Sequence, residues 1–320
     1  MAAGDLADRY VGCLLGLAVG DALGYPVEFA PEEDLLASPV RDFRPLGSAP
    51  PGTFSDDTQM TIALARALLR AGDADLDGLM RAVAEEFVAW ARSPENNRAP
   101  GNTCLAGCHN LARGLPWRQS GVPGSKGCGA AMRSAPVGLY YLSDEPRLVE
   151  VGRAQALCTH AHAVAEAGGV ATAYLVWLAA QGVDPGEYPA RLAATTGPIS
   201  REFADCIERT ASVVDQNQRE AYLHITQGSR QVGWVAEEAV GAALWCFLQA
   251  PEDFSRVVLL AANSPLAADR DSIACIAGAV AGARVGAAGI PPRWRQGVEK
   301  ADLLANLGQE LLTAATKTRP

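Results

Sequence analysis

Two short acidic stretches contain the residues with which this sequence could do chemistry. In the first, Asp56 and Asp57 follow a serine and lead into an apolar run with helical spacing. In the second, Asp269 and Asp271 precede a serine at a similar boundary. Each stretch offers two carboxylates and a hydroxyl, and hard divalent cations prefer such oxygen ligands. The candidate metal ligands are Ser55, Asp56, Asp57, Asp269, Asp271 and Ser272.

Helix capping offers another interpretation of each stretch taken alone. Acidic and hydroxyl residues are favoured at helix starts, where they accept hydrogen bonds from free N–H groups and oppose the helix dipole. Capping requires one oxygen per helix, however, whereas the two stretches together carry four carboxylates. If the four meet in the fold they repel one another, and two divalent cations would remove that repulsion. The pair of stretches therefore favours a metal site with two ions.

One further carboxylate, Glu28, lies just beyond the first apolar run, in a loop beside Pro26. Its side chain could bridge to a metal or orient a water molecule, and it could equally be a solvated loop residue. Asp21 lies inside the apolar run. We interpret Asp21 as a structural residue that caps or orients neighbouring backbone.

A glycine-rich segment, residues 123–129, precedes a predicted helix. Free N–H groups and the helix dipole both favour a diphosphate at such a place, although many glycine-rich turns bind nothing. His160 and His162 could stack on a nucleobase or hydrogen-bond to it, whereas isolated histidines more often satisfy structural hydrogen bonds. Taken alone, neither feature identifies a ligand.

Helical periodicity runs through the chain with few signs of strands, so the sequence predicts an all-α fold. The predicted helices are residues 6–23, 57–70, 76–91, 102–113, 130–142, 147–158, 163–180, 200–214, 235–248, 254–262, 271–288 and 301–316. Glycine and proline concentrate in residues 45–53, 98–102 and 122–129, which we expect to be site-forming loops on this helical frame. No linker of disordered composition divides the chain, so residues 1–320 are predicted to form a single domain.

Two of the predicted helices carry glycines at intervals of four. The stripes are Gly12, Gly16, Gly20 and Gly24 in one helix and Gly278, Gly282 and Gly286 in the other. This spacing places the glycines on one face, where another backbone can come close. Each glycine costs about 1 kcal/mol relative to alanine in a helix. We therefore expect the two helices to pack together near the centre of the core, where close packing compensates.

The amino-acid composition and net charge exclude some classes of protein. The chain has 320 residues, 49% hydrophobic and 20% charged, so it can bury a sizeable core. Its net charge of −9 argues against general attraction to nucleic acid. Asp21 and Arg284 interrupt apolar runs that we take to be too short to span a membrane. The N-terminal residues do not resemble a signal peptide, so we expect a cytoplasmic protein with eight reduced cysteines. Cys104 and Cys108 with His109 form only a weak zinc pattern.

Seven stretches, in order along nearly the whole chain, resemble the ADP-ribosylglycohydrolase family. This family contains dinitrogenase-reductase-activating glycohydrolase and the hydrolases of ADP-ribosyl-arginine and ADP-ribosyl-serine. The stretches are GCLLGLAVGDALG (12–24) with Glu28, SDDTQM (55–60), GNT (101–103), KGCGAAMR (126–133), TH (159–160), GWVAEE (233–238) and DRDSIACIAG (269–278). Each is modest alone, but seven in order are specific.

The resemblance implies an all-helical single domain whose cleft holds two magnesium or manganese ions on the six candidate ligands. Family members cleave the bond at C1″ of the distal ribose of ADP-ribose, and the hydroxyls of that ribose bind the metals. Glu28 would be a mobile carboxylate near this bond, and the catalytic residues would be Glu28, Asp56 and Asp57. The ADP-ribose pocket would be formed by Asn102, Ser125, Lys126, Gly127, Cys128, Gly129, Met132 and His160.

Three departures from the family pattern bear on the linkage that is cleaved. Ala268 stands where glycine is usual, and Arg270 replaces a smaller residue. Ala99 lies near a position where some arginine-specific members carry a catalytic acid. The substrates expected first are mono-ADP-ribosylated protein side chains such as arginine. The alternatives are serine-linked ADP-ribose, its polymers, O-acetyl-ADP-ribose or a nucleic-acid adduct.

A non-catalytic ADP-ribose-binding protein is a further alternative. Retention of both acidic stretches and of Glu28 argues against it, because a mere scaffold has no need of converging carboxylates. The expected partner is the ADP-ribose moiety of a modified substrate, with no membrane, and with nucleic acid only as a modified substrate. We expect the protein to be a monomer.

Overall fold

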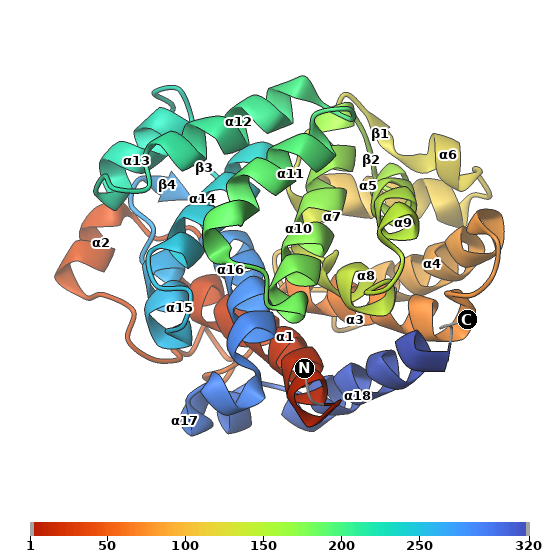
Figure 1. Ribbon diagram of the computed structural model, residues 1–320, viewed down its shortest axis with the longest axis horizontal. Coiled ribbons are helices and arrows are strands. Elements are labelled where there is room, and N and C mark those ends of the chain that lie inside the picture. Colours follow the sequence, from red (N-terminus) through yellow and green to blue (C-terminus); the bar gives the residue numbers. More distant parts are fainter. Residues whose placement is uncertain (1–2, 318–320) are drawn as a thin grey trace.

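Two glycine-striped helices, α1 (Ala3–Gly24) and α16 (Arg270–Val285), pack against each other at the centre of the fold (Figure 1). They are described by a computed structural model that covers residues 3–317. The two backbones leave no room for side chains between them. A Cβ on Gly20 would lie 1.9 Å from the carbonyl oxygen of Ala274. A Cβ on Gly282 would lie 2.0 Å from that of Gly12, so the expected packing of the two stripes is confirmed.

The variant Gly282→Ala should lower the free energy of unfolding by about 3 kcal/mol. Overpacking a core typically costs about 1–3 kcal/mol, and here the added carbon meets backbone rather than a movable side chain. Urea unfolding followed by circular dichroism would measure the change. As a control, Gly78→Ala in α4 (Leu76–Ala91) meets Oδ1 of Asp75 at 2.8 Å, the end of a flexible side chain. The control should change stability by less than about 1 kcal/mol, and equal stability of the two variants would contradict the packing argument.

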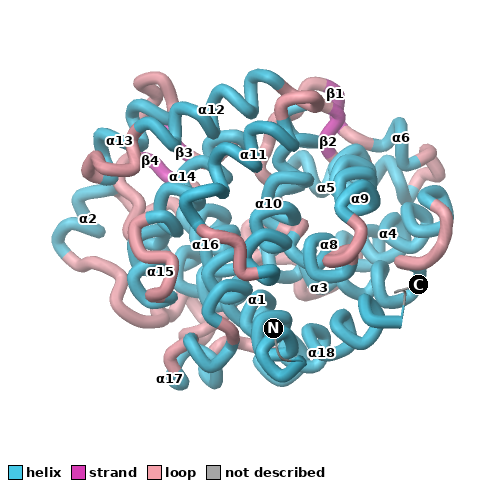
Figure 2. Tube along the Cα trace, viewed as in Figure 1, coloured by secondary structure: helices cyan, strands magenta, loops and turns pink. Residues whose placement is uncertain are grey.

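Longer helices surround the central pair, and each corresponds to an apolar periodic segment of the sequence. They are α3 (Asp56–Ala71), α4, α5 (Asn102–Ala112), α9 (Glu145–Leu157), α10 (Ala163–Gln181), α12 (Arg201–Ser212), α14 (Ala236–Leu248), α15 (Phe254–Ala262) and α18 (Ala301–Lys317). The helical fold class predicted from the sequence is confirmed (Figure 2).

The helix predicted over residues 130–142 is wrong as a single element. It is divided into α7 (Gly129–Met132) and α8 (Ala135–Tyr140). Pro136 lacks the N–H that a continuous helix would donate to the carbonyl of Met132, and its ring would clash there. The chain therefore breaks and restarts with Pro136 in the first turn of α8.

Several short helices were not predicted, and most of them have eight residues or fewer, too few to show an apolar stripe. They are α2 (Glu32–Ala37), α6 (Trp117–Ser120), α11 (Tyr188–Thr196), α13 (Gln218–Ile225), α17 (Pro292–Gly297), η1 (Tyr25–Val27), η2 (Pro185–Glu187) and η3 (Ala287–Gly289). Local caps mark some of them: the side chain of Asn217, for example, accepts from the N–H of Glu220 at the start of α13.

Four two-residue strands form two parallel pairs (Figure 2). The first joins β1 (Val122–Pro123) to β2 (His160–Ala161), and the second joins β3 (Gln231–Val232) to β4 (Ala267–Ala268). The first pair holds the glycine-rich loop beside His160. The second holds residues 231–232 beside the segment that leads into α16. These pairings fix loops rather than build a sheet.

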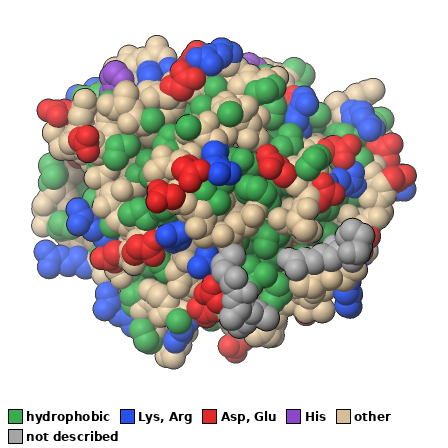
Figure 3. All heavy atoms as spheres, viewed as in Figure 1, with side chains coloured by type: hydrophobic (Ala, Val, Ile, Leu, Met, Phe, Trp, Pro, Cys, Tyr) green, Lys and Arg blue, Asp and Glu red, His purple; other side chains and the backbone are tan. Residues whose placement is uncertain are grey.

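Two helical segments, Asp5–Val27 and Ala163–Gln181, have the length and hydropathy to cross a membrane. The argument that the first run is too short to span is therefore wrong. In each window, however, 83% of the residues are buried inside the protein, which fits the core of a soluble protein. On the face drawn in Figure 3, acidic and basic side chains are interspersed among apolar ones. All eight cysteines are free thiols.

Candidate active site

The two acidic stretches meet at the wall of one cavity of about 390 Å³. Asp56 and Asp57 lie in the first turn of α3, Asp269 is the N-cap of α16, and Asp271 lies in the first turn of α16. All four line the cavity, and Glu28, directly after η1, lines it with them. The fold therefore brings together carboxylates that are far apart in the sequence, as the metal hypothesis requires.

A larger groove, of about 910 Å³, lies between α11 and α12. Its lining is mostly alanine and proline, with one arginine and one glutamate. Because that groove gathers no set of carboxylates, the smaller cavity is the candidate active site.

Capping does not account for the aspartates. The N-cap of α3 is Ser55, whose Oγ accepts from the N–H of Asp57 at 3.2 Å. Asp21 accepts from the N–H of Ser55 at 2.9 Å and of Thr58 at 3.0 Å, so it orients this helix start, as interpreted from the sequence. At α16 the side chain of Asp269 makes no capping hydrogen bond. The start of α3 therefore does not need Asp56 or Asp57 as a cap, although Asp56 accepts from the N–H of Gly101 at 3.3 Å and Asp271 from the N–H of Ser272 at 3.0 Å.

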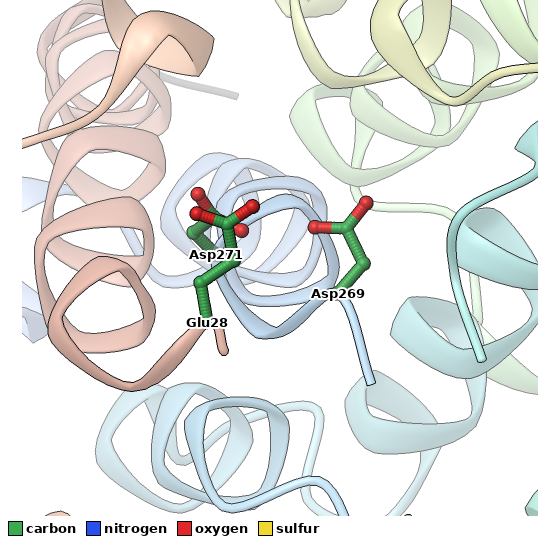
Figure 4. A group of neighbouring side chains, drawn as sticks. All are labelled: Glu28, Asp269 and Asp271. Atoms are coloured by element: carbon green, nitrogen blue, oxygen red, sulfur yellow. The ribbon is translucent and has the colours of Figure 1, made fainter. Parts of the chain in front are cut away.

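Three of the carboxylates converge most closely: Glu28, Asp269 and Asp271. Each offers one oxygen atom within 4.8 Å of the others, and Figure 4 shows the three side chains pointing into the same space. Burial, followed by repulsion from Asp271 and Asp269, raises the pKa of Glu28 to about 11. Such a shift means that a negative charge here lacks compensation from the described protein groups.

The other aspartates of the cavity share this electrostatic environment. Burial, followed by repulsion from Asp271, raises the pKa of Asp56, of Asp57 and of Asp269 well above the usual value. Burial also raises the pKa of Asp271. The cavity is thus built of carboxylates that disfavour one another's charge.

At this cavity, two buried carboxylate oxygens have no hydrogen-bond partner among the residues that the structure describes, Oε2 of Glu28 and Oδ2 of Asp57. Buried polar atoms are ordinarily paired, since an unpaired one costs free energy. A hard divalent cation would satisfy both oxygens and neutralise the cluster. Ser272 adds its hydroxyl at the cavity wall, whereas Ser55 is fully buried and does not line the cavity. The donor set fits such cations.

Arg270, one of the departures from the family pattern, is fully buried. Its guanidinium donates to the carbonyl oxygens of Val27 and Ala30, each at 2.8 Å, and to that of Leu266, also at 2.8 Å. The side chain therefore ties the segment that carries Glu28 to the start of α16. Arg270 therefore positions the residues around the cavity and does not itself line it.

Most of the rest of the predicted site lines the cavity from α5, α7, β2 and the glycine-rich loop. The predicted ligand-binding residues that line it are Asn102, Gly127, Cys128, Gly129, Met132 and His160. The thiol of Cys128 donates to Oδ2 of Asp269 at 3.1 Å, which joins this wall to the acidic one. Burial, followed by the charge of Arg133, lowers the pKa of His160 to about 3, so its ring is neutral at physiological pH.

Besides Ser55, three candidates lie outside the cavity lining. Oγ of Ser125 is 3.1 Å from that of Thr103, and Lys126 forms an ion pair with Glu202 on α12. His162 is the N-cap of α10, where its Nδ1 accepts from the N–H of Val164 at 3.1 Å. That position favours the structural interpretation of His162.

Sequence reasoning gave no role at the site to two aromatic residues of the lining. Phe29 and Trp234 stack at the cavity with ring centroids 5.9 Å apart, and Phe29 is 72% exposed. Ala99 also lines it, in the left-handed region with φ of 53°. The sequence did hold a signal for both aromatic residues. Phe29 follows Glu28, and Trp234 lies in the GWVAEE stretch, and both places carry the family resemblance.

Comparisons with known proteins agree with this geometry. The family model for ADP-ribosylglycohydrolase matches residues 2–320. A similar relative is "ADP-ribosylarginine hydrolase Tri1" from Pseudomonas putida (strain GB-1), 30% identical over 314 residues, which cover 96% of this chain and 79% of the relative. "ADP-ribosylhydrolase ARH3" from Mus musculus is 28% identical over 343 residues, covering 93% of this chain and 90% of the relative.

A solved structure gives the same result for the fold. The chain described as "ADP-ribosylglycohydrolase-related protein complex" superposes with a TM-score of 0.77 at 28% identity, covering 98% of this chain and 99% of that one. Together with the family match over almost every residue, this agreement shows that the chain belongs to the ADP-ribosylglycohydrolase family of hydrolases.

Proposed function

We propose that the protein is a metal-dependent hydrolase that cleaves the C1″ glycosidic bond of ADP-ribosylated substrates, in the first place mono-ADP-ribosylated arginine side chains. One observation carries this proposal: carboxylates from both acidic stretches line the same cavity as the glycine-rich loop and His160. The volume of about 390 Å³ lies within the range of small-molecule sites, about 300–1,000 Å³.

The metal ligands in this proposal are Ser55, Asp56, Asp57, Asp269, Asp271 and Ser272, and the ions are two Mg²⁺ or Mn²⁺. When bound, the ions would neutralise the carboxylates and orient the hydroxyls of the distal ribose. The unpaired Oδ2 of Asp57 supports this assignment, because a buried carboxylate oxygen without a partner needs one.

Glu28 handles the proton in our proposal. Hydrolysis adds water at C1″, so one proton must leave the attacking water and the leaving group must gain one. Bound cations would offset the repulsion that raises the pKa of Glu28, and its Oε2, which has no hydrogen-bond partner among residues 3–317, could then accept a proton. Cleavage also builds positive charge on the ribose ring, and the acidic wall of the cavity favours that charge.

The other end of the ligand would lie against the glycine-rich loop. The backbone of residues 127–129 and the side chains of Asn102, Met132 and His160 are at hand for the diphosphate and the ribose hydroxyls. Ser125 and Lys126 would take part from outside the cavity lining, through the loop that they share with Gly127.

A panel of substrates tests the proposal. Arginine-, serine- and nucleic-acid-linked ADP-ribose would each be incubated with the protein in Mg²⁺, in Mn²⁺ and in excess chelator, and released ADP-ribose measured. We expect release from the arginine-linked substrate with either metal and none in chelator. Full activity in chelator would contradict the metal dependence. Cleavage of none of the three substrates would contradict the proposed hydrolysis.

A second class of substrate is favoured by Ala99. This residue lines the cavity near the place where some arginine-specific members of the family carry a catalytic acid, and its methyl group cannot carry a proton. Serine-linked ADP-ribose, its polymers, O-acetyl-ADP-ribose or nucleic-acid adducts are therefore the alternative substrates. Faster cleavage of the serine-linked member of the panel would favour this second class over arginine.

We further propose that the protein acts as a monomer in the cytoplasm. Eight free cysteines suit a reducing compartment. Light scattering coupled to size-exclusion chromatography should give a mass near the 33.5 kDa of one chain, and a mass twice as large would contradict the monomer.

A further inference from the structure

Behind the cavity wall, three side chains form a line of hydrogen bonds that ends at His160. The Nη2 atom of Arg133 lies 2.8 Å from Oγ1 of Thr159. The same oxygen lies 2.8 Å from Nδ1 of His160. Arg133 and Thr159 are fully buried, and His160 is almost so, with its ring at the cavity. Neither Arg133 nor Thr159 lines the cavity, and the proposed hydrolysis assigns no role to either.

The hydrogen-bonding capacity of each group fixes the direction of this line. A guanidinium only donates, so Oγ1 of Thr159 must accept from Arg133. The hydroxyl then has one hydrogen left to donate. Its other potential acceptor, the carbonyl oxygen of Ala156, is 3.5 Å away, whereas Nδ1 of His160 is at 2.8 Å. The hydroxyl therefore donates to Nδ1, which must be the unprotonated nitrogen of the ring.

A neutral imidazole carries one proton, so an acceptor at Nδ1 places that proton at Nε2. The ring is neutral, since burial and Arg133 lower the pKa of His160 to about 3. Nε2 makes no hydrogen bond to any of residues 3–317. Around it, a Cβ on Gly127 would come within 3.0 Å of Nε2, and one on Gly129 within 2.9 Å of Cε1. The glycines thus keep side-chain atoms away from the N–H edge of the ring, which is nearly buried and lines the cavity.

Arg133 is held firmly enough to act as the fixed end of the line. Its Nε donates to Oε1 of Gln155 at 2.8 Å, and its Nη2 also donates to the carbonyl oxygen of Gln155 at 2.9 Å. The guanidinium carbon lies 4.5 Å from the centre of the Phe87 ring. Because the Arg133 side chain is held in this way, it keeps donating to Oγ1 of Thr159. The hydroxyl of Thr159 therefore keeps its hydrogen for Nδ1 of His160.

We propose that Arg133 and Thr159 are positioning residues that hold His160 as a neutral N–H donor at Nε2, through which it binds an acceptor oxygen of the ligand. The identity of that ligand as ADP-ribose, with diphosphate and ribose oxygens as the acceptors, rests on the proposed function. The orientation of the ring and the place of its proton rest on the protein alone. His160 is accordingly a binding residue that does not exchange a proton during turnover.

Nitrogen NMR of the ligand-free protein tests the tautomer directly. The chain has four histidines, so a long-range proton–nitrogen spectrum of ¹⁵N-histidine-labelled protein contains few signals. The signals that disappear in the variant His160→Gln are those of His160. We expect Nδ1 of His160 at a pyridine-like shift and Nε2 at a pyrrole-like shift, unchanged between pH 8 and roughly pH 5. The reverse pattern, or two pyrrole-like nitrogens, would overturn the proposal.

Two variants of Thr159 test the positioning role. Thr159→Val removes the hydroxyl but keeps the branched shape, and Thr159→Ser keeps the hydroxyl. Calorimetric titration with ADP-ribose should show about 10-fold weaker binding for the valine variant and near-native binding for the serine variant. The valine variant should also lose the fixed nitrogen pattern, with its circular dichroism spectrum unchanged. Arg133 is left intact, because its removal would disturb the core.

The outcomes separate this inference from the proposed function. If the wild-type protein binds ADP-ribose and both Thr159 variants bind it equally well, the positioning role is wrong and the proposed function stands. If the wild-type protein does not bind ADP-ribose, the proposed function fails, while the nitrogen spectrum still decides the tautomer. Weaker binding restored by serine, together with the expected nitrogen shifts, supports the proposal.

Discussion

Replacing Asp271 with asparagine should lower the rate of ADP-ribosyl hydrolysis by about 10³-fold. Metal ions in hydrolases contribute several kcal/mol to transition-state stabilisation, and about 4 kcal/mol corresponds to this factor. Asp271 lies at the junction of the cluster, because its charge contributes to the raised pKa of Glu28, of Asp56, of Asp57 and of Asp269. The measurement is release of ADP-ribose from the preferred substrate of the panel in saturating Mg²⁺ or Mn²⁺.

The same substitution should stabilise the protein when metal is absent. A buried carboxylate that repels its neighbours costs free energy, and asparagine removes the charge with little change of shape. A gain of about 1 kcal/mol would raise the Tm of the chelator-treated protein by about 2–4 °C. Asp302→Asn is the matched control, since Asp302 is exposed in the first turn of α18. Native activity of Asp271→Asn, or a lower Tm without metal, would argue against the repelling cluster.

Glu28→Gln should lower kcat by about 10²–10⁴-fold while metal binding stays near that of the wild type. The amide keeps the shape of the side chain but cannot accept a proton, and general acid–base catalysis contributes about this factor. Steady-state kinetics gives kcat, and titration with Mn²⁺ gives the affinity for metal. Glu28 therefore differs from Asp271, whose loss should remove both activity and metal binding.

The control for this variant is Glu33→Gln in the exposed helix α2, a few residues further along the chain. It should retain activity and metal binding. If Glu28→Gln instead loses metal binding together with activity, Glu28 is a metal ligand, and another group must handle the proton. A carboxylate oxygen of Glu28 lies within 4.8 Å of one from Asp269 and one from Asp271, close enough for the three to share a metal ion.

The helical fold and the acidic part of the site could be predicted because their signals are local. A serine and two carboxylates at the start of an apolar run mark a helix start, and the glycine stripes of α1 and α16 show which helices approach closely. The choice between metal binding and capping, however, depends on residues that are far apart in the sequence. Only the structure shows that Ser55 and Asp21 already satisfy the start of α3, so that Asp56 and Asp57 are not needed as caps.

Other parts of the site depend on partners that no short pattern reveals. Lys126 sits in the glycine-rich loop, but its ammonium pairs with Glu202 from α12. Arg270 looked like a departure from the family pattern, and its role follows from its hydrogen bonds to the carbonyl oxygens of Val27, at the end of η1, and of Ala30. The line from Arg133 through Thr159 to His160 likewise joins separate elements, so it became visible only with the fold.

Calorimetric titration of the chelator-treated protein with Mn²⁺ or Mg²⁺ tests most directly whether the two acidic helix starts hold cations. We predict two binding events per chain for the wild-type protein and loss of binding in Asp271→Asn, with Asp302→Asn unchanged. Absence of binding to the wild-type protein, or equal binding to the wild-type protein and Asp271→Asn, would contradict the account.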